Sequence, residues 1–397
     1  MFGRRIVRIC LEGVYYTLVL AFIVSGAVVR DINLLFALAG MMVGPLLINW
    51  RMVVRSVRRL HVERRLPQQI FAGRPFRVEI HAENRRRRTG SWMVVVEDVI
   101  HPETTGAGRA RHARKSKVRV VLPFVGARQA GTATYRAMLP RRGRYRFGPL
   151  RVSTRFPLGL VKASTRIRRY ERLLVFPHLG RLSRDWLQIV DTAQLGRHEM
   201  HCRRGPIDGD YYGLREWRPG DSRRWIHWRT TAKLGKLAVR EFEQQRNRDM
   251  TLVVDLWQPD DPTDADRGRV ELAVSFAATV VDELARRGAS RLIVALAAER
   301  PGWWAATASG VFARQTLERL ALVRAARDNR LAQVLAEVLP SVPFGAHIVV
   351  ISTRPDATDE LSASATFARI PRHQRMLNRV VWLDVSDPRV LSVFHWD

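Results

Sequence analysis

The chain has 397 residues, of which 46% are hydrophobic and 26% charged, so its composition is globular rather than disordered or collagen-like. This length predicts two or three domains. Lys and Arg number 67 against 37 Asp and Glu, a formal charge of +30 that favours anionic lipid, nucleic acid or acidic proteins as partners. The two cysteines, Cys10 and Cys202, exclude a disulfide scaffold and a zinc site made of thiolates alone.

Two uncharged apolar runs open the chain, at Val14–Val29 and Ile32–Asn49. Each approaches the ~17 to 25 residues that a helix needs to cross the ~30 Å hydrocarbon layer of a membrane. A signal peptide would be followed by polar sequence, whereas only Arg30 and Asp31 separate these two runs. We therefore predict a retained transmembrane helical hairpin with basic flanks over residues 1–59.

Arginines gather outside both runs, at Arg4, Arg5, Arg8, Arg51, Arg55, Arg58 and Arg59. The turn between the runs carries only Arg30, which Asp31 offsets. Because Lys and Arg resist translocation, we expect a two-pass protein of the inner membrane, with both termini cytoplasmic and its basic flanks close to the lipid. The alternative, two buried helices of a soluble core, would rarely be so free of charge and so sharply flanked by arginine.

Short runs of alternating apolar residues, separated by turn residues, follow between about Leu60 and Val175. The clearest runs are Phe76–Asn84, Trp92–Ile100, Val118–Phe124 and Thr132–Leu139. Strands at this spacing predict an antiparallel β-sandwich-like domain over residues 60–175. The arginine run 85–88 is expected to form a solvated hairpin tip. Two further strands with Gly-Pro and Pro157–Gly159 turns are predicted within Leu139–Ser164.

A dense polar segment occupies residues 203–243, inside a predicted loop region over residues 176–248. Asp, Arg, Trp and Gly crowd together there without regular periodicity until about Leu237. A Pro-Gly turn at 219–220 precedes Asp221, which is placed to cap a short helix. Trp225 and Trp228 are expected to be buried. Arginine–carboxylate pairs are expected to hold the loop, with members drawn from Arg215, Arg224, Glu216, Asp221 and Glu241.

The run LREWRPGDSRRWIHWRTTAKLGKLAVREFE resembles the signature of the domain of unknown function 58 family. The upstream run RRGRYRFGPLRVSTRFPLGL resembles another stretch of that family. Three positions depart from the family pattern: Trp217 replaces Tyr, His227 replaces Asp or Asn, and Phe156 replaces Asp. The resemblance singles out as site residues Arg215, Pro219, Gly220, Asp221, Arg224, Ile226, Trp228 and Glu241, with Ala232, Leu237 and Val239 also matching.

This resemblance implies an accessory or scaffold protein, because the family has no established enzymatic activity. Its members are often encoded beside MoxR-type AAA+ ATPases and von Willebrand factor A-like proteins. A partner ATPase of that type is therefore expected.

Residues 249–397 alternate between apolar strands and helices. The predicted strands are 250–257, 291–298, 346–352 and 379–386, and the predicted helices are Arg269–Gly288 and Thr316–Leu339. Continuous apolar strands separated by helices predict an α/β domain with a parallel sheet covered on both faces. This domain resembles the von Willebrand factor A type. Trp303 and Trp304 fit either the core or an exposed partner contact.

That type can hold a metal ion through an Asp-x-Ser-x-Ser motif after its first strand. Asp255 is present here, but Trp257 and Pro259 stand at the two Ser positions, so the hydroxyl ligands for a hard cation such as Mg²⁺ are missing. We therefore expect no metal and no cofactor. A variant carboxylate site is the alternative, built from Asp260, Asp261, Asp264, Asp266, Thr353 and Asp356.

The expected function is a non-catalytic, membrane-anchored scaffold whose cytoplasmic domains bind partner proteins. Two alternatives remain open. A hydrolase would need a histidine base and an aspartate partner, drawn from His198, His201, His227, Asp208, Asp210 and Asp221. Nonspecific nucleic-acid binding would use arginines interleaved with Trp217, Trp225 and Trp228. Nucleic acid is the less favoured partner, because the arginines are spread along the whole chain and no nucleic-acid-binding motif is present.

Overall fold

The chain is a multidomain protein with two apolar helices followed by a sheet-rich α/β remainder. Two compact units make it up, Met1–His178 with Leu317–Leu322, and Leu179–Thr316 with Val323–Asp397. The computed structural model describes residues 6–103, 116–183, 186, 211–218, 221–242, 249–288, 290–343, 345–363, 367 and 376–396.

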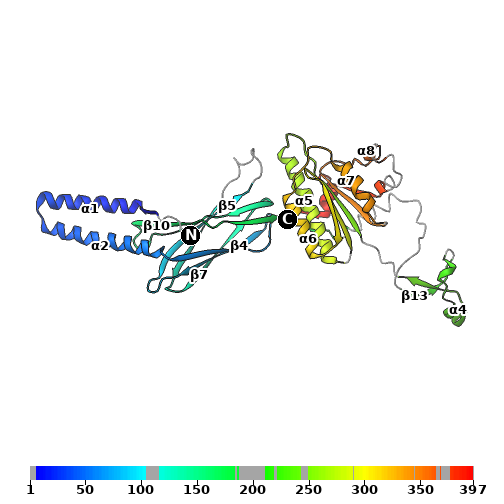
Figure 1. Ribbon diagram of the computed structural model, residues 1–397, viewed down its shortest axis with the longest axis horizontal. Helices are drawn as coiled ribbons and strands as arrows, with labels where there is room; N and C mark the ends of the chain where they lie inside the picture. The colour runs from blue at the N-terminus through cyan, green and yellow to red at the C-terminus, as the bar shows by residue number, and fades with distance from the viewer. Residues whose placement is uncertain are drawn as a thin grey trace. The chain divides into compact units, whose positions relative to one another are not determined.

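The predicted helical hairpin is confirmed as α1 (Leu11–Arg30) and α2 (Asn33–Ser56), which lie antiparallel (Figure 1). Asp31 makes the turn in the left-handed conformation, at φ 44°. Both helices are long and apolar enough to cross a membrane, and an apolar stretch of 18 residues in each has a mean hydropathy of 1.7 in α1 and 1.5 in α2. Only 11% of each of these stretches is buried. Core helices of a soluble domain would be mostly buried, so this exposure favours a membrane anchor.

The β-rich region forms two sheets. The strands are β1 (Ile6–Ile9), β2 (Leu60–Arg65), β3 (Ile70–Phe71), β4 (Pro75–Asn84), β5 (Ser91–Pro102), β6 (Ser116–Val125), β7 (Ala130–Met138), β8 (Gly143–Phe147), β9 (Leu150–Thr154), β10 (Val161–Ile167) and β11 (Glu171–Phe176). The larger sheet has the order β1-β10-β9-β5-β8-β11-β3, with β6 paired to β5, and the smaller has β2-β4-β7. All of these pairs are antiparallel except β11 with β3.

The two sheets share one apolar core. Val62 and Ile80 of the smaller sheet and Val96, Leu122 and Val152 of the larger sheet belong to a single buried cluster. On β4 every second side chain from Val78 to Asn84 is buried, which is the period-2 pattern of a strand with one face on a core. The alternation seen in the sequence therefore comes from packing between two sheets.

A buried ion pair joins the two sheets across this core. Arg64 of β2 donates two hydrogen bonds to Asp98 of β5, at 2.7 and 2.5 Å. The hydroxyl of Tyr135 on β7 donates to the same carboxylate at 2.7 Å. Burial, and then the charge of Asp98, raise the pKa of Tyr135. A one-residue slip of β2, β5 or β7 would leave the Arg64, Asp98 and Tyr135 side chains unpaired, so this network fixes the register of these three strands.

The expected solvated tip at residues 85–88 is wrong for Arg86, which is 8% exposed. Its guanidinium donates to the carbonyl oxygens of Arg55 (2.7 Å) and Ser56 (3.3 Å), the last residues of α2. It also donates to the carbonyl of Gly90 and to the hydroxyl of Ser91. Burial lowers the pKa of Arg86. Helix ends expose carbonyls that lack partners and favour a nearby cation, so this arginine turns inward to join α2 to the sandwich.

The α/β unit holds a five-stranded sheet with the order β17-β16-β15-β18-β19. Its parallel strands are β15 (Met250–Asp255), β16 (Arg291–Ala297), β18 (His347–Ser352) and β19 (Val380–Asp384), as expected, and β17 (Gly302–Thr307) is an antiparallel edge. The helices are α5 (Asp264–Arg287), α6 (Gly310–Leu322), α7 (Leu331–Val338), α8 (Thr358–Ala363) and α11 (Pro388–Val393). Figure 1 shows α5 and α7 on opposite faces of the sheet.

One predicted helix of this unit is wrong, and the position of Trp303 and Trp304, which the sequence left open, is defined by the structure. The predicted helix Thr316–Leu339 is two helices, because the intervening backbone pairs with strand ends: Ala326 donates to Leu256 and accepts from Gln258. Trp303 and Trp304 lie on the edge strand β17, where Trp303 is 38% exposed and the Trp304 indole donates to Thr316. The strands β12 (Arg181–Leu182) and β20 (Phe394–His395), distant in sequence, form a separate two-stranded antiparallel sheet.

Replacing Arg86 by Ala should lower the free energy of unfolding by about 3 kcal/mol, because buried carbonyls at the end of α2 lose their charged donor. Chemical denaturation of the full chain in detergent micelles measures this loss. Arg88→Ala removes an exposed arginine from the same loop and should change stability by less than about 0.5 kcal/mol. Equal effects of the two substitutions would contradict the structural role of Arg86.

Candidate functional site

The polar segment folds into a small unit that we call the signature hairpin, residues 211–242. It contains β13 (Tyr211–Glu216), the 3₁₀ helix η2 (Arg223–Trp225), α4 (Trp228–Leu234) and β14 (Ala238–Phe242). β13 and β14 pair antiparallel, with Arg215 opposite Val239. Pro219 and Gly220 lie outside the described residues, as do His198, His201, Cys202, Asp208 and Asp210. Glu241 lies on β14.

Arg215 and Asp221 form a bidentate ion pair inside the loop. The two guanidinium nitrogens of Arg215 donate to the two carboxylate oxygens at 2.7 and 2.8 Å. The backbone N–H of Arg218 donates to the same carboxylate at 2.8 Å. The side chain of Asp221 is only 7% exposed. Asp221 therefore closes the Arg218–Asp221 turn with Arg215 as its partner, while Arg224 is exposed on η2.

His227 caps α4. Its Nδ1 accepts from the backbone N–H of Thr230 at 3.3 Å and lies 2.8 Å from the Thr230 hydroxyl. The family pattern has Asp or Asn at this position, and both are favoured N-cap residues. The capping geometry therefore gives a structural account of the departure at His227. The backbone N–H of His227 also donates to Ala238 O at 2.8 Å, which ties the helix start to β14.

Apolar side chains of the signature hairpin face outward. Trp228 is 67% exposed, so its predicted burial is wrong, and Trp225 is half-buried. Leu234 is 64% exposed, Leu237 42% and Leu214 38%. Only Ile226, Ala238 and Val239 are buried among the hairpin side chains that the structure describes. A helix of one or two turns against a two-stranded sheet cannot bury more, so the remaining apolar groups stay on the surface.

These exposed apolar side chains belong to a strongly basic segment. Residues 211–242 contain eight Lys or Arg against three Asp or Glu. One of the three acids, Asp221, is held by Arg215, and another, Glu216, is paired with Lys236 at 3.2 Å. The hairpin therefore combines exposed apolar groups with an excess of positive charge.

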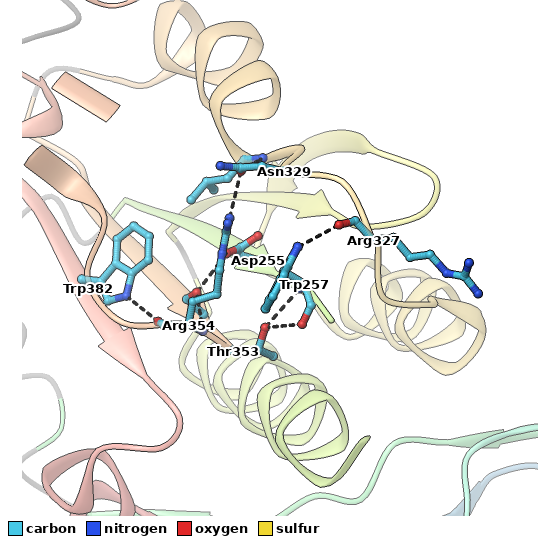
Figure 2. Close-up of polar contacts among 9 residues, drawn as sticks. Asp255, Trp257, Arg327, Asn329, Thr353, Arg354 and Trp382 are labelled. Atoms are coloured by element: carbon cyan, nitrogen blue, oxygen red, sulfur yellow. Dashed lines mark hydrogen bonds and ion pairs between the residues drawn. The ribbon is translucent and has the colours of Figure 1, made fainter. Parts of the chain in front are cut away.

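The second candidate region lies at the carboxyl end of β15, where Asp255 is 1% exposed (Figure 2). Its carboxylate accepts from Arg354 Nε at 3.0 Å and from the Ser352 hydroxyl at 2.9 Å. Arg354 also donates to Asn329 Oδ1 at 2.9 Å, and its guanidinium lies 5.6 Å from the Trp257 ring centroid. Burial raises the pKa of Asp255, and the charge and hydrogen bond of Arg354 oppose that rise.

Five of the six other residues of the hypothetical carboxylate site, all except Asp261, have a structural partner described below. Thr353 exchanges hydrogen bonds with the backbone N–H and carbonyl of Trp257, at 3.1 and 2.7 Å. Asp266 forms a capping box with Thr263 at the start of α5, and the Thr263 hydrogen bonds lower the pKa of Asp266. Asp264 pairs with Arg267, Asp260 with Arg327, and Asp356 accepts from the backbone N–H of Thr358.

These residues do not fit a divalent cation. The Arg354 guanidinium is hydrogen-bonded to the Asp255 carboxylate, in the place where a cation would bind. The nearby hydroxyl of Thr353 is hydrogen-bonded to the backbone of Trp257. Within the described ranges, no group of three His, Cys, Asp or Glu side chains is placed to hold a metal ion. Arg354 and Asn329 were not foreseen from the sequence, since only the parallel pairing of β15 with β18 brings position 354 to Asp255.

Together, these parts define a multidomain chain with two helices able to span a membrane, a basic hairpin and an α/β sheet. The family model described as "Protein of unknown function DUF58" matches residues 213–351, from β13 to β18. The uncharacterized protein YeaD of Bacillus subtilis (strain 168) is 24% identical over 211 residues, which cover 52% of this chain and 48% of that protein. The chain thus spans about half the length of this relative. Both findings support the resemblance to the DUF58 family.

Likeness to solved structures is weak. Spo0M, a sporulation control protein from Bacillus subtilis, is 12% identical and matches 41% of this chain and 59% of that chain, at a TM-score of 0.21. The CARDB domain of a Pyrococcus furiosus protein is 15% identical and matches 29% of this chain and 91% of that chain, at a TM-score of 0.18. Scores this low carry no argument about fold or function.

A double-mutant cycle on Arg215→Met and Asp221→Asn should give a coupling energy of about 1 kcal/mol, because the pair is bidentate and its carboxylate is buried. Hydrogen exchange of the hairpin amides, such as Trp217 N–H bonded to Leu237 O, reports this local stability. The exposed Lys236–Glu216 pair is the matched control and should couple by no more than about 0.5 kcal/mol. Equal couplings in the two cycles would show that the Arg215–Asp221 pair does not hold the loop.

Arg354→Met should destabilise the α/β unit by about 3 kcal/mol at pH 7, since it leaves a buried carboxylate without its cation. The loss should shrink as the pH falls toward 5. A raised folded pKa means that folding takes up a proton, so stability is present at low pH and is lost as the pH rises through that pKa.

Unfolding midpoints measured across this pH range provide the test. When Asp255→Asn is the background, the effect of Arg354→Met should no longer depend on pH, because no carboxylate remains at position 255. The same destabilisation by Arg354→Met at both pH values would contradict this account.

Proposed function

We propose that this chain is a non-catalytic, membrane-anchored scaffold or accessory protein whose signature hairpin binds a partner protein. The observation that carries the proposal is the exposure of four large apolar side chains of the hairpin, Trp228, Leu234, Leu237 and Leu214, within a basic segment. Exposed aromatic residues surrounded by polar groups are typical of binding hot spots. The expected partner therefore offers an apolar pocket with an acidic rim.

The proposed orientation places both termini, the β-sandwich, the signature hairpin and the α/β unit in the cytoplasm. Arginine-rich flanks support it, since Arg51, Arg55, Arg58 and Arg59 follow the apolar part of α2 and are expected to resist translocation. The proposed partner is then a cytoplasmic one, of which a MoxR-type AAA+ ATPase is the first candidate. The resemblance to the DUF58 family is the reason for that choice.

The α/β unit is proposed to be of the von Willebrand factor A type and to act without a metal ion. Its parallel strands β16-β15-β18-β19 and its antiparallel edge strand β17 support the assignment. The Asp255–Arg354 pair supports metal independence, because a fixed guanidinium supplies the positive charge that a cation would bring. In this proposal the unit is a second surface for protein contacts.

The structural roles of the polar residues favour binding over catalysis. A general base needs a free ring nitrogen and a partner that orients it. His227 Nδ1 accepts the N–H of Thr230 in capping α4, so the neutral ring carries its proton on Nε2 and has no free lone pair to act as a base, and the Asp221 carboxylate is held by Arg215 and Arg218. Hydrolysis by these two residues would require both sets of bonds to break. Catalysis therefore remains the alternative, together with nonspecific nucleic-acid binding.

The test is binding of the full chain, in lipid nanodiscs, to a MoxR-type AAA+ ATPase. Trp228→Ala should weaken binding about 30-fold, the effect of losing about 2 kcal/mol at a hot spot. Met138→Ala removes an exposed apolar side chain from β7 of the β-sandwich, outside both proposed contact surfaces, and should leave the affinity unchanged.

Absence of binding in both ATP and ADP, or equal loss in the two variants, would contradict the proposal. Hydrolysis of a model substrate that Asp221→Ala abolishes would support the catalytic alternative instead. Affinity for DNA that disappears at moderate salt would indicate counterion release only.

A further inference from the structure

One end of the β-sandwich carries a cluster of exposed apolar side chains that we call the membrane-side rim. It consists of Trp92 and Met93 on β5, Phe124 on β6 and Leu158 in the turn after β9, all between 43% and 51% exposed. Trp92 contacts Phe124 with ring centroids 4.3 Å apart, and it stacks on Phe156 at 5.5 Å. These side chains come from three separate strand ends and form one cluster at the surface.

The backbone of β5 turns two consecutive apolar residues outward. Met93 has φ 44°, in the left-handed region that non-glycine residues rarely adopt. In a regular strand one of Trp92 and Met93 would face the core, whereas here both are exposed while Ser91 and Val94 are buried. A local conformation that is costly in itself thus keeps apolar groups at the surface.

The rim adjoins the point where the apolar part of α2 ends. The backbone N–H of Leu158 donates to Asn49 Oδ1 of α2 at 3.3 Å, and the N–H of Cys10, just before α1, donates to Leu160 O at 2.9 Å. Asn49 is followed by Trp50, 48% exposed, and then by Arg51. Aromatic residues next to arginine at the end of an apolar span are typical of the membrane–water interface.

Cations crowd the same end of the sandwich. Exposed arginines stand beside the rim in sequence or beside the end of α2, at Arg51, Arg55, Arg87, Arg88 and Arg155. Burial, and then the charges of Arg155, Arg151 and Arg119, lower the pKa of Lys162 on β10. That mutual repulsion marks a surface that anionic groups would stabilise.

We propose that the membrane-side rim inserts into the interfacial zone of the same bilayer that α1 and α2 span, with Trp92, Met93, Phe124 and Leu158 among the upper acyl chains and the arginines on anionic headgroups. This inference rests on the membrane anchoring in the proposed function and adds a second, peripheral contact made by the sandwich itself. Its bond to Asn49 holds the rim at the depth where α2 leaves the hydrocarbon. The sandwich is thereby held against the membrane rather than suspended from it.

The test uses spin labels on the full chain in nanodiscs containing phosphatidylglycerol, in a Cys10→Ser/Cys202→Ser background. Labels at Phe124→Cys and Leu158→Cys report the rim. Met138→Cys, 61% exposed and opposite Pro75 at the other end of β4, is the matched control on the same sandwich. Phe22→Cys, 80% exposed on α1, reports the anchor independently. Relaxation by oxygen, which concentrates in lipid, is compared with relaxation by a water-soluble nickel complex.

The rim labels are expected to favour oxygen over nickel relative to Met138, with values between those of Phe22 and Met138. Rim labels as accessible to nickel as Met138, with Phe22 still in lipid, would overturn the rim contact and leave the anchor standing. A Phe22 label accessible to nickel would overturn both. Because the two rim positions lie on different strand ends, loss of folding in one variant leaves the other as a test.

Discussion

The buried guanidinium of Arg86 links the two apolar helices α1 and α2 to the β-sandwich. A charged donor is costly to bury, and this one is offset by carbonyl oxygens at the end of α2 and by polar groups of the β4–β5 loop. Ser91 adds a second link, since its hydroxyl donates to Ser56 O at 2.9 Å. Helices joined to the sandwich by these bonds cannot rotate freely against it, as they could if only a flexible linker connected them. The positions of the rim and of the basic flank both depend on this junction.

Arginine acts as an internal counter-ion at three further places. Arg64 pairs with Asp98 between the sheets, Arg215 with Asp221 in the signature hairpin, and Arg354 with Asp255 at the sheet edge. In each pair the carboxylate is buried, so the arginine contributes to folding and is not available to a ligand. The high arginine content is thus partly structural, and the groups left for binding are the exposed apolar residues and the cations around them.

Residue patterns alone predict the two apolar helices and the parallel strands, because each is a continuous or alternating apolar run bounded by charged or turn-forming residues. The buried position of Arg86 has no such signal, since Arg85, Arg87 and Arg88 beside it are exposed. The break between α6 and α7 escapes prediction because backbone pairing of Ala326 with Leu256 overrides a helical pattern. At the candidate site, the Arg215–Asp221 pairing follows from the residue types. The exposure of Trp228 does not, because it depends on how few apolar side chains the short helix α4 can bury against β13 and β14. Arg354 reaches Asp255 only through the folded sheet.

The bonds of Arg86 and Ser91 to the end of α2 imply that α1, α2 and the β-sandwich move as one rigid body. Double electron–electron resonance between spin labels at Leu38→Cys on α2 and Met138→Cys on β7, in nanodiscs and a Cys10→Ser/Cys202→Ser background, tests it most directly. Both sites are exposed, at 43% and 61%. The account predicts a single narrow distance distribution that broadens when Arg86 is replaced by Ala. A broad distribution in the chain with Arg86 intact would contradict it.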